Sequence, residues 1–370
     1  MSKKKILHIQ VLPKLSGVQK ISLEIFRALP SDQYEKWILF SDSLDTGDKQ
    51  ACQEAFEQAG AKVLFSSNLR RSIGFRDWNA AKEIYRLCRA ERFDIVHTHS
   101  TKPGIIGRLA ATWAKVPLVI HTVHGLAFHK FVRFPQWQFY WVCEMLASCF
   151  CDRIVLVNRF YSKYFKWFRK KTSTIYNGVD FRTFPAVEPR VTDDVCNVLF
   201  VGRLDTPKDP LTLLRAAKIV LSQRDDIRFT LVGDGEKYDE CFQFICQNNM
   251  SDRVKLVGWQ NSVSSYYASH HLFVAPSIYE SFGLMFVEAG YYGLPVISTN
   301  VEGIPEVVQN GVTGFLCKPR NERQIAERII SLSNNKELML RMGEAARQRV
   351  TLLFDARAMT EQYIKVYNHQ

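Results

Sequence analysis

Strand-like and helix-like segments alternate along almost the whole chain. Apolar runs typical of buried strands occur at residues 5–11, 35–40, 61–65, 93–98, 117–121 and 153–157. Helix-like segments lie between them, for example at residues 16–29, 78–92 and 102–115. Because strand–helix–strand order connects parallel strands, the pattern predicts an α/β fold, with a parallel sheet covered by helices on both faces.

The alternation is interrupted once, by a polar stretch with prolines at residues 180–194. It then restarts, with strand-like runs at residues 196–201, 227–232, 254–256, 272–275, 295–298 and 314–316. This predicts two doubly wound domains, the first at residues 1–180 and the second at residues 195–353. Residues 354–370 have apolar positions at helical spacing, so we expect a terminal helix that packs back on the first domain.

Composition limits the class of protein. The 370 residues are 46% hydrophobic and 23% charged, which is ordinary for a globular protein and argues against disorder. The longest apolar stretches have strand length, and the run at residues 6–11 is too short for a signal peptide. Nine cysteines, of which only Cys149 and Cys151 are closely spaced, favour reduced thiols over a disulfide framework. We therefore expect a cytoplasmic protein without a membrane span.

The segment between Pro276 and Glu288, PSIYESFGLMFVE, carries the most specific chemistry. It follows a strand-like run and leads into a helix-like run that ends near Tyr292. Gly283 allows a ligand to approach the backbone, and the first amides of a helix attract phosphate. Carboxylates at Glu280 and Glu288 flank this position and could read hydroxyl groups. The combination suits a sugar nucleotide.

Two further turns of the second domain follow predicted strands. Gly202 opens the first turn, from which Arg203 and Lys208 project as two cations suited to a diphosphate. A surface loop with two solvated cations is the alternative. Gly233 begins a glycine-rich turn, GDGE, that lacks the third glycine of a dinucleotide fingerprint and also fits a simple tight turn.

In the first domain, small residues and histidines occupy predicted strand ends. Ser16 and Gly17 open the first helix and allow close approach to its amides. Four histidines, His97, His99, His121 and His124, end two successive strands. No cysteine or carboxylate spacing completes a metal site, so we expect no metal. One or two of these rings are expected to meet a ligand, and the others to form structural hydrogen bonds.

The order of these motifs resembles that of retaining glycosyltransferases of family 4, which have the GT-B fold of two Rossmann-like domains facing a central cleft. The matching positions are Gly17, His124, the run IYNGVD at residues 175–180, Gly202 with Arg203, Lys208, the GDG run at residues 233–235, Glu280 and Glu288. The resemblance covers nearly the whole chain. Ser16 departs from it, because the family often has a second glycine there.

The resemblance implies a role for each matched residue. Arg203 and Lys208 would hold the donor diphosphate, Glu288 the ribose hydroxyls, and Glu280 and His124 the transferred sugar. The implied donor-binding set is Gly17, Gly202, Gly233, Ser281, Phe282, Gly283, Leu284, Glu288 and Asn177. Members of the family retain the anomeric configuration, and a front-face route without a metal or another cofactor is expected.

A basic, aromatic segment covers residues 129–171. It contains nine basic and two acidic residues, so it holds +7 of the net charge of +12 of the whole chain. Cations beside aromatic rings suit anionic lipid headgroups, which predicts peripheral contact with a membrane. The alternative is a buried helix at residues 137–150 followed by an exposed basic one. RNA binding is a third interpretation, but no nucleic-acid motif accompanies the segment, and no nucleic-acid partner is expected.

Taken together, the sequence predicts a glycosyltransferase on the inner face of the cell membrane. It would transfer a sugar from a nucleotide-sugar donor, with UDP as the first choice, to a lipid-linked saccharide in polysaccharide or O-antigen synthesis. A soluble acceptor, a catalytically degenerate scaffold that binds a sugar nucleotide, and an epimerase of similar fold are the alternatives. The sugar, the base and the linkage are not encoded in recognisable motifs.

Overall fold

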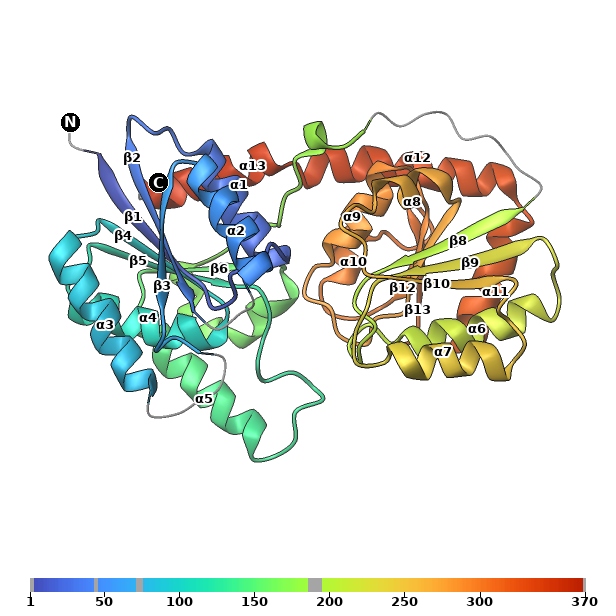
Figure 1. Cartoon of the computed structure of the whole chain (residues 1–370), viewed down its shortest axis with the longest axis horizontal. Helices are drawn as coiled ribbons and strands as arrows, with labels where there is room; N and C mark the ends of the chain where they lie inside the picture. The colour runs from blue at the N-terminus through green and yellow to red at the C-terminus, as the bar shows by residue number, and fades with distance from the viewer. Residues whose placement is uncertain (1–2, 43–45, 71–75, 186–194, 369–370) are drawn as a thin grey trace. The chain divides into compact units, whose positions relative to one another are not determined.

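The computed structural model describes residues 3–42, 46–70, 76–185 and 195–368 (Figure 1). The chain divides into two compact units, which we describe separately. The first unit consists of Met1–Gly178 and Ala356–Gln370, and the second consists of Val179–Asp355. The first transition between them lies between Gly178 and Val179, just before the interruption predicted at residues 180–194, and residues 186–194 lie outside the described part of the chain.

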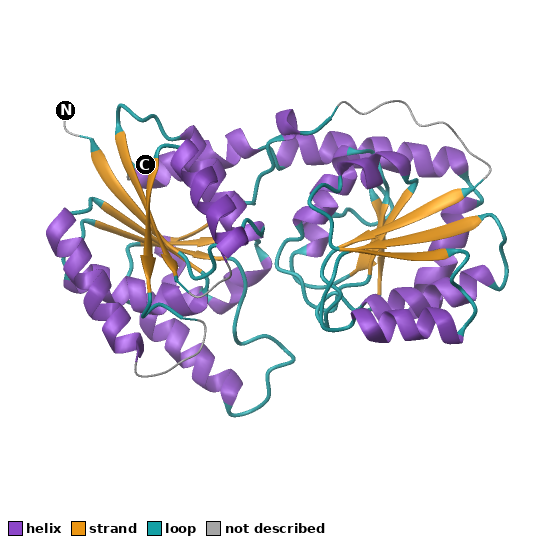
Figure 2. Cartoon of the chain, viewed as in Figure 1, coloured by secondary structure: helices purple, strands orange, loops and turns teal. Residues whose placement is uncertain are grey.

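The first unit is built on a seven-stranded parallel sheet with the order β3-β2-β1-β4-β5-β6-β7. Its strands are β1 (Lys4–Ile9), β2 (Tyr34–Ser41), β3 (Ala61–Ser66), β4 (Ile95–His99), β5 (Leu118–Val123), β6 (Arg153–Leu156) and β7 (Thr172–Thr174). The central strands β1, β4 and β5 are almost completely buried, because helices cover both faces of the sheet (Figure 2).

The helices of the first unit form two layers. They are α1 (Gly17–Ala28), α2 (Thr46–Gln58), α3 (Arg76–Glu91), α4 (Thr101–Trp113), α5 (Gln136–Ser148) and α13 (Ala356–Tyr367), with 3-10 turns η1 (Phe160–Tyr164) and η2 (Lys166–Lys171). Apolar side chains of α3, α4 and α5 form one core with β1, β2, β4, β5 and β6. Helix α13 packs beside α1, as the sequence predicted for the terminal helix.

The second unit repeats the architecture on a six-stranded parallel sheet with the order β10-β9-β8-β11-β12-β13. Its strands are β8 (Cys196–Val201), β9 (Ile227–Val232), β10 (Val254–Gly258), β11 (Leu272–Ala275), β12 (Val296–Thr299) and β13 (Gly314–Cys317). Its helices are α6 (Pro210–Leu221), α7 (Tyr238–Gln247), α8 (Ser264–Ser269), α9 (Leu284–Tyr291), α10 (Ile304–Val307), α11 (Glu322–Ser333) and α12 (Lys336–Leu353), with a 3-10 turn η3 (Phe181–Thr183).

The predicted α/β class with two doubly wound domains is confirmed. All twelve predicted strands are present, with ends that differ by up to two residues. The sequence missed β7, which is three residues long and carries no large apolar side chain. Among the helices in the described part of the chain, none combines the length and the apolar character needed to cross a membrane.

The interpretation of residues 137–150 as a buried helix is wrong for most of the surface of α5. Only four residues of this helix are buried, and all four lie in its last turns. Phe139 is 55% exposed and Leu146 is 61% exposed. Trp137, Tyr140 and Trp141 are partly buried and pack against the core. The helix therefore has one face on the core and one apolar face in solvent.

Candidate active site

In the second unit, the loops that follow β8 and β9 pack closely at the carboxyl ends of these strands. Gly233 has φ +138°, and a Cβ added there would lie 1.9 Å from the carbonyl oxygen of Gly202. The amide of Gly202 donates a hydrogen bond to the carbonyl of Val232 over 3.0 Å, and that of Gly233 donates to Gly258 over 2.8 Å. A side chain at Gly233 would separate the loops, which explains why the glycine is required.

The loop after β8 also brings together two of the predicted site residues. The ammonium group of Lys208 forms an ion pair with the Glu280 carboxylate, and both side chains are largely buried. The amide of Ile278 donates to the carbonyl of Pro207 over 2.9 Å and ties the loop of Glu280 to that of Lys208. The structure thus joins the cation and the carboxylate, which lie 72 residues apart in the sequence.

Arg203 lies in the same loop but is held less tightly. Its Nη2 atom lies 2.7 Å from Asp205 Oδ2, and its side chain is 66% exposed. An exposed ion pair of this kind contributes little to stability. The guanidinium can therefore exchange Asp205 for an anionic ligand at small cost in free energy.

The start of α9 has the geometry of an anion-binding site. Gly283 precedes this helix with φ +83°, and a Cβ there would lie 2.5 Å from the Phe286 ring. No side-chain hydrogen bond caps this end of the helix. Ser281 and Phe282 precede the glycine, and Leu284 is the first helical residue. The first amides of α9 are thus oriented to donate hydrogen bonds to a phosphate oxygen.

Glu288 lies on α9 and is held by a residue that the sequence analysis missed. The hydroxyl of Tyr267, on α8, donates a hydrogen bond to Glu288 Oε2 over 3.0 Å. Burial, together with the neighbouring Glu288 carboxylate, raises the pKa of Tyr267, so the hydroxyl keeps its proton as a donor. No local motif marks Tyr267, because its partner lies 21 residues further along the chain.

In the first unit, His124 follows β5 and begins a chain of hydrogen-bonded histidines. Its Nε2 atom lies 3.0 Å from Nδ1 of His99. Nε2 of His99 lies 3.2 Å from Oγ of Ser22, and Ser22 lies 3.1 Å from Nδ1 of His8. His8 was not among the candidates from the sequence, because it lies inside the strand predicted at residues 5–11 rather than at its end.

The chain of histidines continues to the terminal helix α13. The hydroxyl of Tyr367 lies 3.1 Å from Nε2 of His8 and 2.8 Å from Nδ1 of His97. Nε2 of His97 in turn lies 2.7 Å from Oγ1 of Thr122 on β5. We call His8, His97, His99 and His124, with the hydroxyl groups between them, the histidine network. It extends from the end of β5 to α13 within one unit.

Burial determines the charge state of the histidine network. Desolvation lowers the pKa of His8, His97 and His99 well below the ordinary value, and it lowers the pKa of His124 to about 3. These rings are therefore neutral near pH 7. His124 keeps some solvent exposure and is the member of the network that a ligand can reach.

Three of these rings form the one group of possible metal ligands found among the described residues. The ligand atoms of His8, His97 and His99 lie within 4.8 Å of one another. Each of their ring nitrogens also has a hydrogen-bonding neighbour in the histidine network. The hydrogen bonds account for the cluster without an ion, and metal independence stays a prediction.

The remaining candidates in the first unit are Gly17 and Asn177. Gly17 begins α1, and Oγ of Ser16 before it donates to Oε1 of Gln19 over 2.6 Å. Asn177 is 7% exposed, and its Oδ1 atom has no hydrogen-bond partner among the described residues. A buried amide oxygen without a partner is costly in a folded protein, so this atom is a candidate for ligand contact.

The two Rossmann-like domains, with the terminal helix packed on the first of them, have the architecture of the GT-B fold. Among solved structures, the fold is similar to that of Anabaena HepE in complex with UDP and glucose. The TM-score is 0.82 at 21% sequence identity, over 99% of this chain and 100% of HepE.

Family models assign both domains. The model described as Glycosyltransferase Family 4 matches residues 15–182, and that of Glycosyl transferases group 1 matches residues 187–349. An Escherichia coli UDP-Gal:alpha-D-GlcNAc-diphosphoundecaprenol alpha-1,3-galactosyltransferase is 32% identical, over 94% of this chain and 92% of its own length. The Staphylococcus aureus capsular polysaccharide biosynthesis glycosyltransferase CapM is 26% identical, over 100% and 98%. The chain belongs to the family 4 glycosyltransferases.

Proposed function

We propose that this glycosyltransferase transfers a sugar from a UDP-sugar to a lipid-linked saccharide during the assembly of a bacterial polysaccharide such as O-antigen. We further propose that it retains the anomeric configuration and needs no metal. The observation that carries the proposal is the buried Lys208–Glu280 ion pair. It lies among loops that also present Arg203, and Glu280 shortly precedes the start of α9.

These groups suit the departure of a nucleoside diphosphate. Breaking the anomeric bond increases negative charge on the diphosphate, which fixed cations and amides stabilise. Lys208 provides a point charge and Arg203 a planar pair of donors, while the first amides of α9 supply neutral donors. Because these groups supply the stabilisation themselves, a metal is not required by the proposed chemistry.

The proposed roles of the carboxylates follow from their surroundings. Glu280 orients Lys208 in the ion pair and keeps a second carboxylate oxygen for hydroxyl groups of the sugar. Glu288, oriented by Tyr267, accepts hydrogen bonds from the ribose. In the front-face route, the departing phosphate accepts the proton of the acceptor hydroxyl, so no protein nucleophile is needed. The role of His124 towards the sugar stays a prediction.

UDP is proposed as the nucleotide because the names of a relative and of a structural neighbour include it. The E. coli relative is named for UDP-Gal, and HepE has been crystallised with UDP. Thermal stabilisation by UDP-, GDP- and dTDP-sugars tests the choice, since the bound donor raises the melting temperature. A larger stabilisation by GDP- or dTDP-sugars than by UDP-sugars would overturn it.

A lipid-linked acceptor and a peripheral position on the inner face of the membrane are proposed together. The E. coli relative is named for an acceptor linked to diphosphoundecaprenol. In the basic segment at residues 129–171, Phe134 is 80% exposed and Trp167 is 76% exposed. Such rings partition to the headgroup region of a bilayer. Sedimentation with anionic vesicles, weakened by salt and by Trp167→Ala, is expected. No binding at low salt would contradict the membrane proposal.

The transfer chemistry is tested by Lys208→Ala. Loss of this cation should lower the transfer rate by about 10²–10³-fold, as for other groups that stabilise developing charge. Lys255→Ala is the matched control, because Lys255 is an exposed cation on β10 of the same unit. Transfer at the wild-type rate in Lys208→Ala would overturn the assignment, and the anomeric configuration of the product tests retention.

A further inference from the structure

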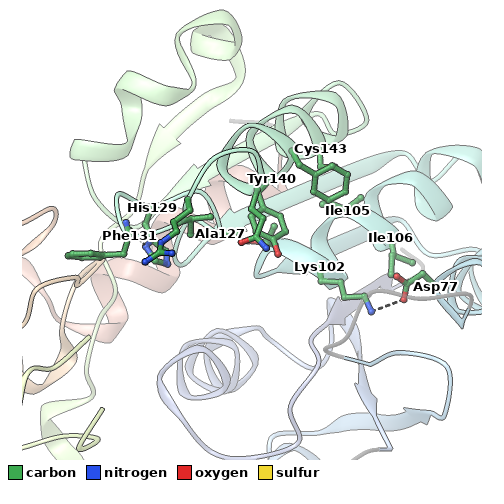
Figure 3. A pocket seen from close by; sticks show the side chains of 14 residues that line it. Asp77, Lys102, Ile105, Ile106, Ala127, His129, Phe131, Tyr140 and Cys143 are labelled. Atoms are coloured by element: carbon green, nitrogen blue, oxygen red, sulfur yellow. Dashed lines mark hydrogen bonds and ion pairs between the residues drawn. The ribbon is translucent and has the colours of Figure 1, made fainter. Parts of the chain in front are cut away.

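The first unit contains a pocket of about 980 Å³ that none of the proposed donor contacts uses. Figure 3 shows it between the start of α4, the loop that follows β5, and the first turns of α5. All of its described lining residues belong to the first unit, between Asp77 and Cys143. Its volume is in the range of pockets that hold drug-sized ligands.

Part of the pocket lining is basic. Lys102, on the first turn of α4, directs its ammonium group to Asp77 with an N–O distance of 2.6 Å (Figure 3). Arg133 is exposed and lies just before α5. Helices α4 and α5 both begin at the pocket, and no side-chain hydrogen bond caps either start. Two cations and two helix starts favour an anion with more than one phosphate.

Another part of the lining is apolar. Ile105 and Ile106 of α4 and Tyr140 and Cys143 of α5 line this part (Figure 3). Phe139 lines the pocket as well, and 55% of its surface is exposed. The pocket is therefore amphipathic, with cations and apolar walls contributed by the same two helices.

A buried ion pair holds these two helices together. Nη1 of Arg108, on α4, lies 2.9 Å from Oε1 of Glu144 on α5, and both side chains are almost inaccessible. Nε of Arg108 also donates to the carbonyl of Gly104 over 2.9 Å. Separating the helices would leave a buried charge without a partner, which is strongly unfavourable. The walls of the pocket are thus fixed before a ligand binds.

We propose that this pocket holds the diphosphate and the first isoprenyl units of a polyprenyl-diphosphate-linked acceptor. The inference rests on the proposed function and names the part of the acceptor that the first unit recognises. Lys102, Arg133 and the helix starts bind the diphosphate, and Lys102 exchanges Asp77 for a phosphate oxygen. The isoprenyl chain lies against Tyr140 and the isoleucines, and Phe139 covers it where it leaves the protein.

A binding experiment tests the pocket without transfer. Farnesyl diphosphate is titrated into the full chain with saturating UDP, which keeps its diphosphate out of the donor site. Binding by the wild type is expected to be at least about tenfold tighter than by Lys102→Gln or Arg133→Gln, because each loses a charged hydrogen-bond donor. Arg89→Gln, an exposed arginine on α3 outside the pocket, should bind as the wild type does.

The two parts of the ligand are separated by further probes. Pyrophosphate and farnesol should each bind at least about tenfold more weakly than farnesyl diphosphate, because each engages only one part of the lining. Phe139→Ala should weaken farnesyl diphosphate but leave pyrophosphate unchanged. Equal binding of farnesyl diphosphate by the wild type and by the Lys102 and Arg133 variants would overturn the proposal. Equal affinity for a short-chain phosphatidylglycerol would overturn the choice of a diphosphate lipid.

A transfer experiment distinguishes failure of this inference from failure of the proposed function. With a diphosphate-linked lipid acceptor, Arg133→Gln should raise the acceptor KM by about tenfold and leave the KM of the UDP-sugar within about twofold. Wild-type transfer with an unchanged acceptor KM in the variant would overturn the pocket and leave the function standing. Farnesyl diphosphate binding without transfer to any diphosphate lipid would support the pocket and contradict the function.

Discussion

At the scale of single residues, the hydroxyl of Tyr267 determines how Glu288 is presented. Tyr267→Phe removes the hydrogen bond of 3.0 Å to Glu288 and keeps the buried ring. We expect UDP to bind about tenfold more weakly, since the carboxylate loses the hydrogen bond from Tyr267 and the orientation that this bond gives it. The kcat should change little, because Glu288 is proposed to contact the ribose rather than the reacting atoms.

The control for Tyr267 separates ribose recognition from a change in packing. Tyr266→Phe changes a partly exposed tyrosine on the same helix and should bind UDP as the wild type does. With a donor that carries 2′,3′-dideoxyribose, the wild type and Tyr267→Phe should bind alike. A tenfold difference that persists with the dideoxy donor would contradict the role of Glu288 at the ribose.

Two constraints apply to Gly283, a positive φ and a lack of room for a side chain. Comparison with Gly311 allows the two to be measured separately. Both Gly283 and Gly311 have positive φ, of +83° and +77°, but only Gly283 lacks room for a Cβ. Gly311→Ala should cost about 1 kcal/mol of unfolding free energy, from the backbone conformation alone. Gly283→Ala should cost about 1–3 kcal/mol more, from crowding against Phe286, and should weaken UDP binding.

The loss of unfolding free energy in each glycine variant is measured by urea unfolding, with hydrogen exchange of the second unit as the readout. The comparison with Gly311→Ala is needed because a positive φ strains any alanine. If the two variants lost equal stability and bound UDP equally, the start of α9 would not depend on the contact between residue 283 and Phe286.

At the scale of secondary-structure elements, α13 is attached to the sheet of the first unit by tyrosine hydroxyls. Tyr367→Phe removes the hydroxyl group that both His8 and His97 contact. Nε2 of His8 and Nδ1 of His97, which are both buried, then lose this hydrogen-bonding neighbour. We expect the first unit to lose about 1–3 kcal/mol, the usual cost of buried polar groups without partners. Tyr363→Phe should cost less, because that hydroxyl lies 3.3 Å from Thr122 Oγ1 in a longer contact.

Hydrogen exchange of β1 and β4 amides measures the effect of both tyrosine variants on the first unit. Equal protection in Tyr367→Phe and in the wild type would show that apolar packing alone holds α13 against the sheet.

The strands were predictable from the sequence because the chain buries them on both faces. Each predicted strand is a short run of mainly apolar residues, and β-sheet pairing needs little more in a doubly wound fold. The short strand β7 (Thr172–Thr174) lacks this pattern and was missed. The surface of α5 was not predictable either, since an aromatic face in solvent and an aromatic face in a core have the same spacing in the sequence.

The site was predictable only where a residue lies in a local motif. Arg203, Lys208 and Glu280 lie in turns that follow strands, Glu288 lies on the helix after such a turn, and the resemblance to a family implied their roles. Tyr267 and Tyr367 act through partners that are distant in the sequence. Tyr267 contacts Glu288, which is 21 residues away, and Tyr367 contacts His97, which is 270 residues away. Only the fold reveals such contacts. His8 was missed because it lies inside a predicted strand, where no turn marks it.

At the scale of the whole molecule, the histidine network makes stability depend on pH. Its rings have lowered pKa values in the folded state, about 3 for His124, whereas histidines of an unfolded chain titrate near pH 6.5. The unfolded chain therefore binds more protons below about pH 6.5, and stability falls as the pH falls. Above about pH 6.5, the contribution of the neutral histidines to the stability of the fold is fully present.

The urea midpoint of the first unit is expected to be lower at pH 5.5 than at pH 7.5, and hydrogen exchange of β1 and β4 reports it. A difference between the midpoints at these two pH values reports mainly on histidines, because most carboxylates titrate below pH 5.5. Equal midpoints at the two pH values would mean that the rings accept protons without unfolding, which contradicts their burial.

Helix α13 has a consequence for the order in which the protein folds while it is being synthesised. The second unit is one continuous stretch, Val179–Asp355, whereas the first unit includes Ala356–Gln370. Domains usually fold from the N-terminus as they leave the ribosome. Here the second unit can complete its folding first. His8 and His97 can form their contacts with Tyr367 only after α13 has emerged from the ribosome. Proteolysis of stalled nascent chains should find the second unit protected before the first.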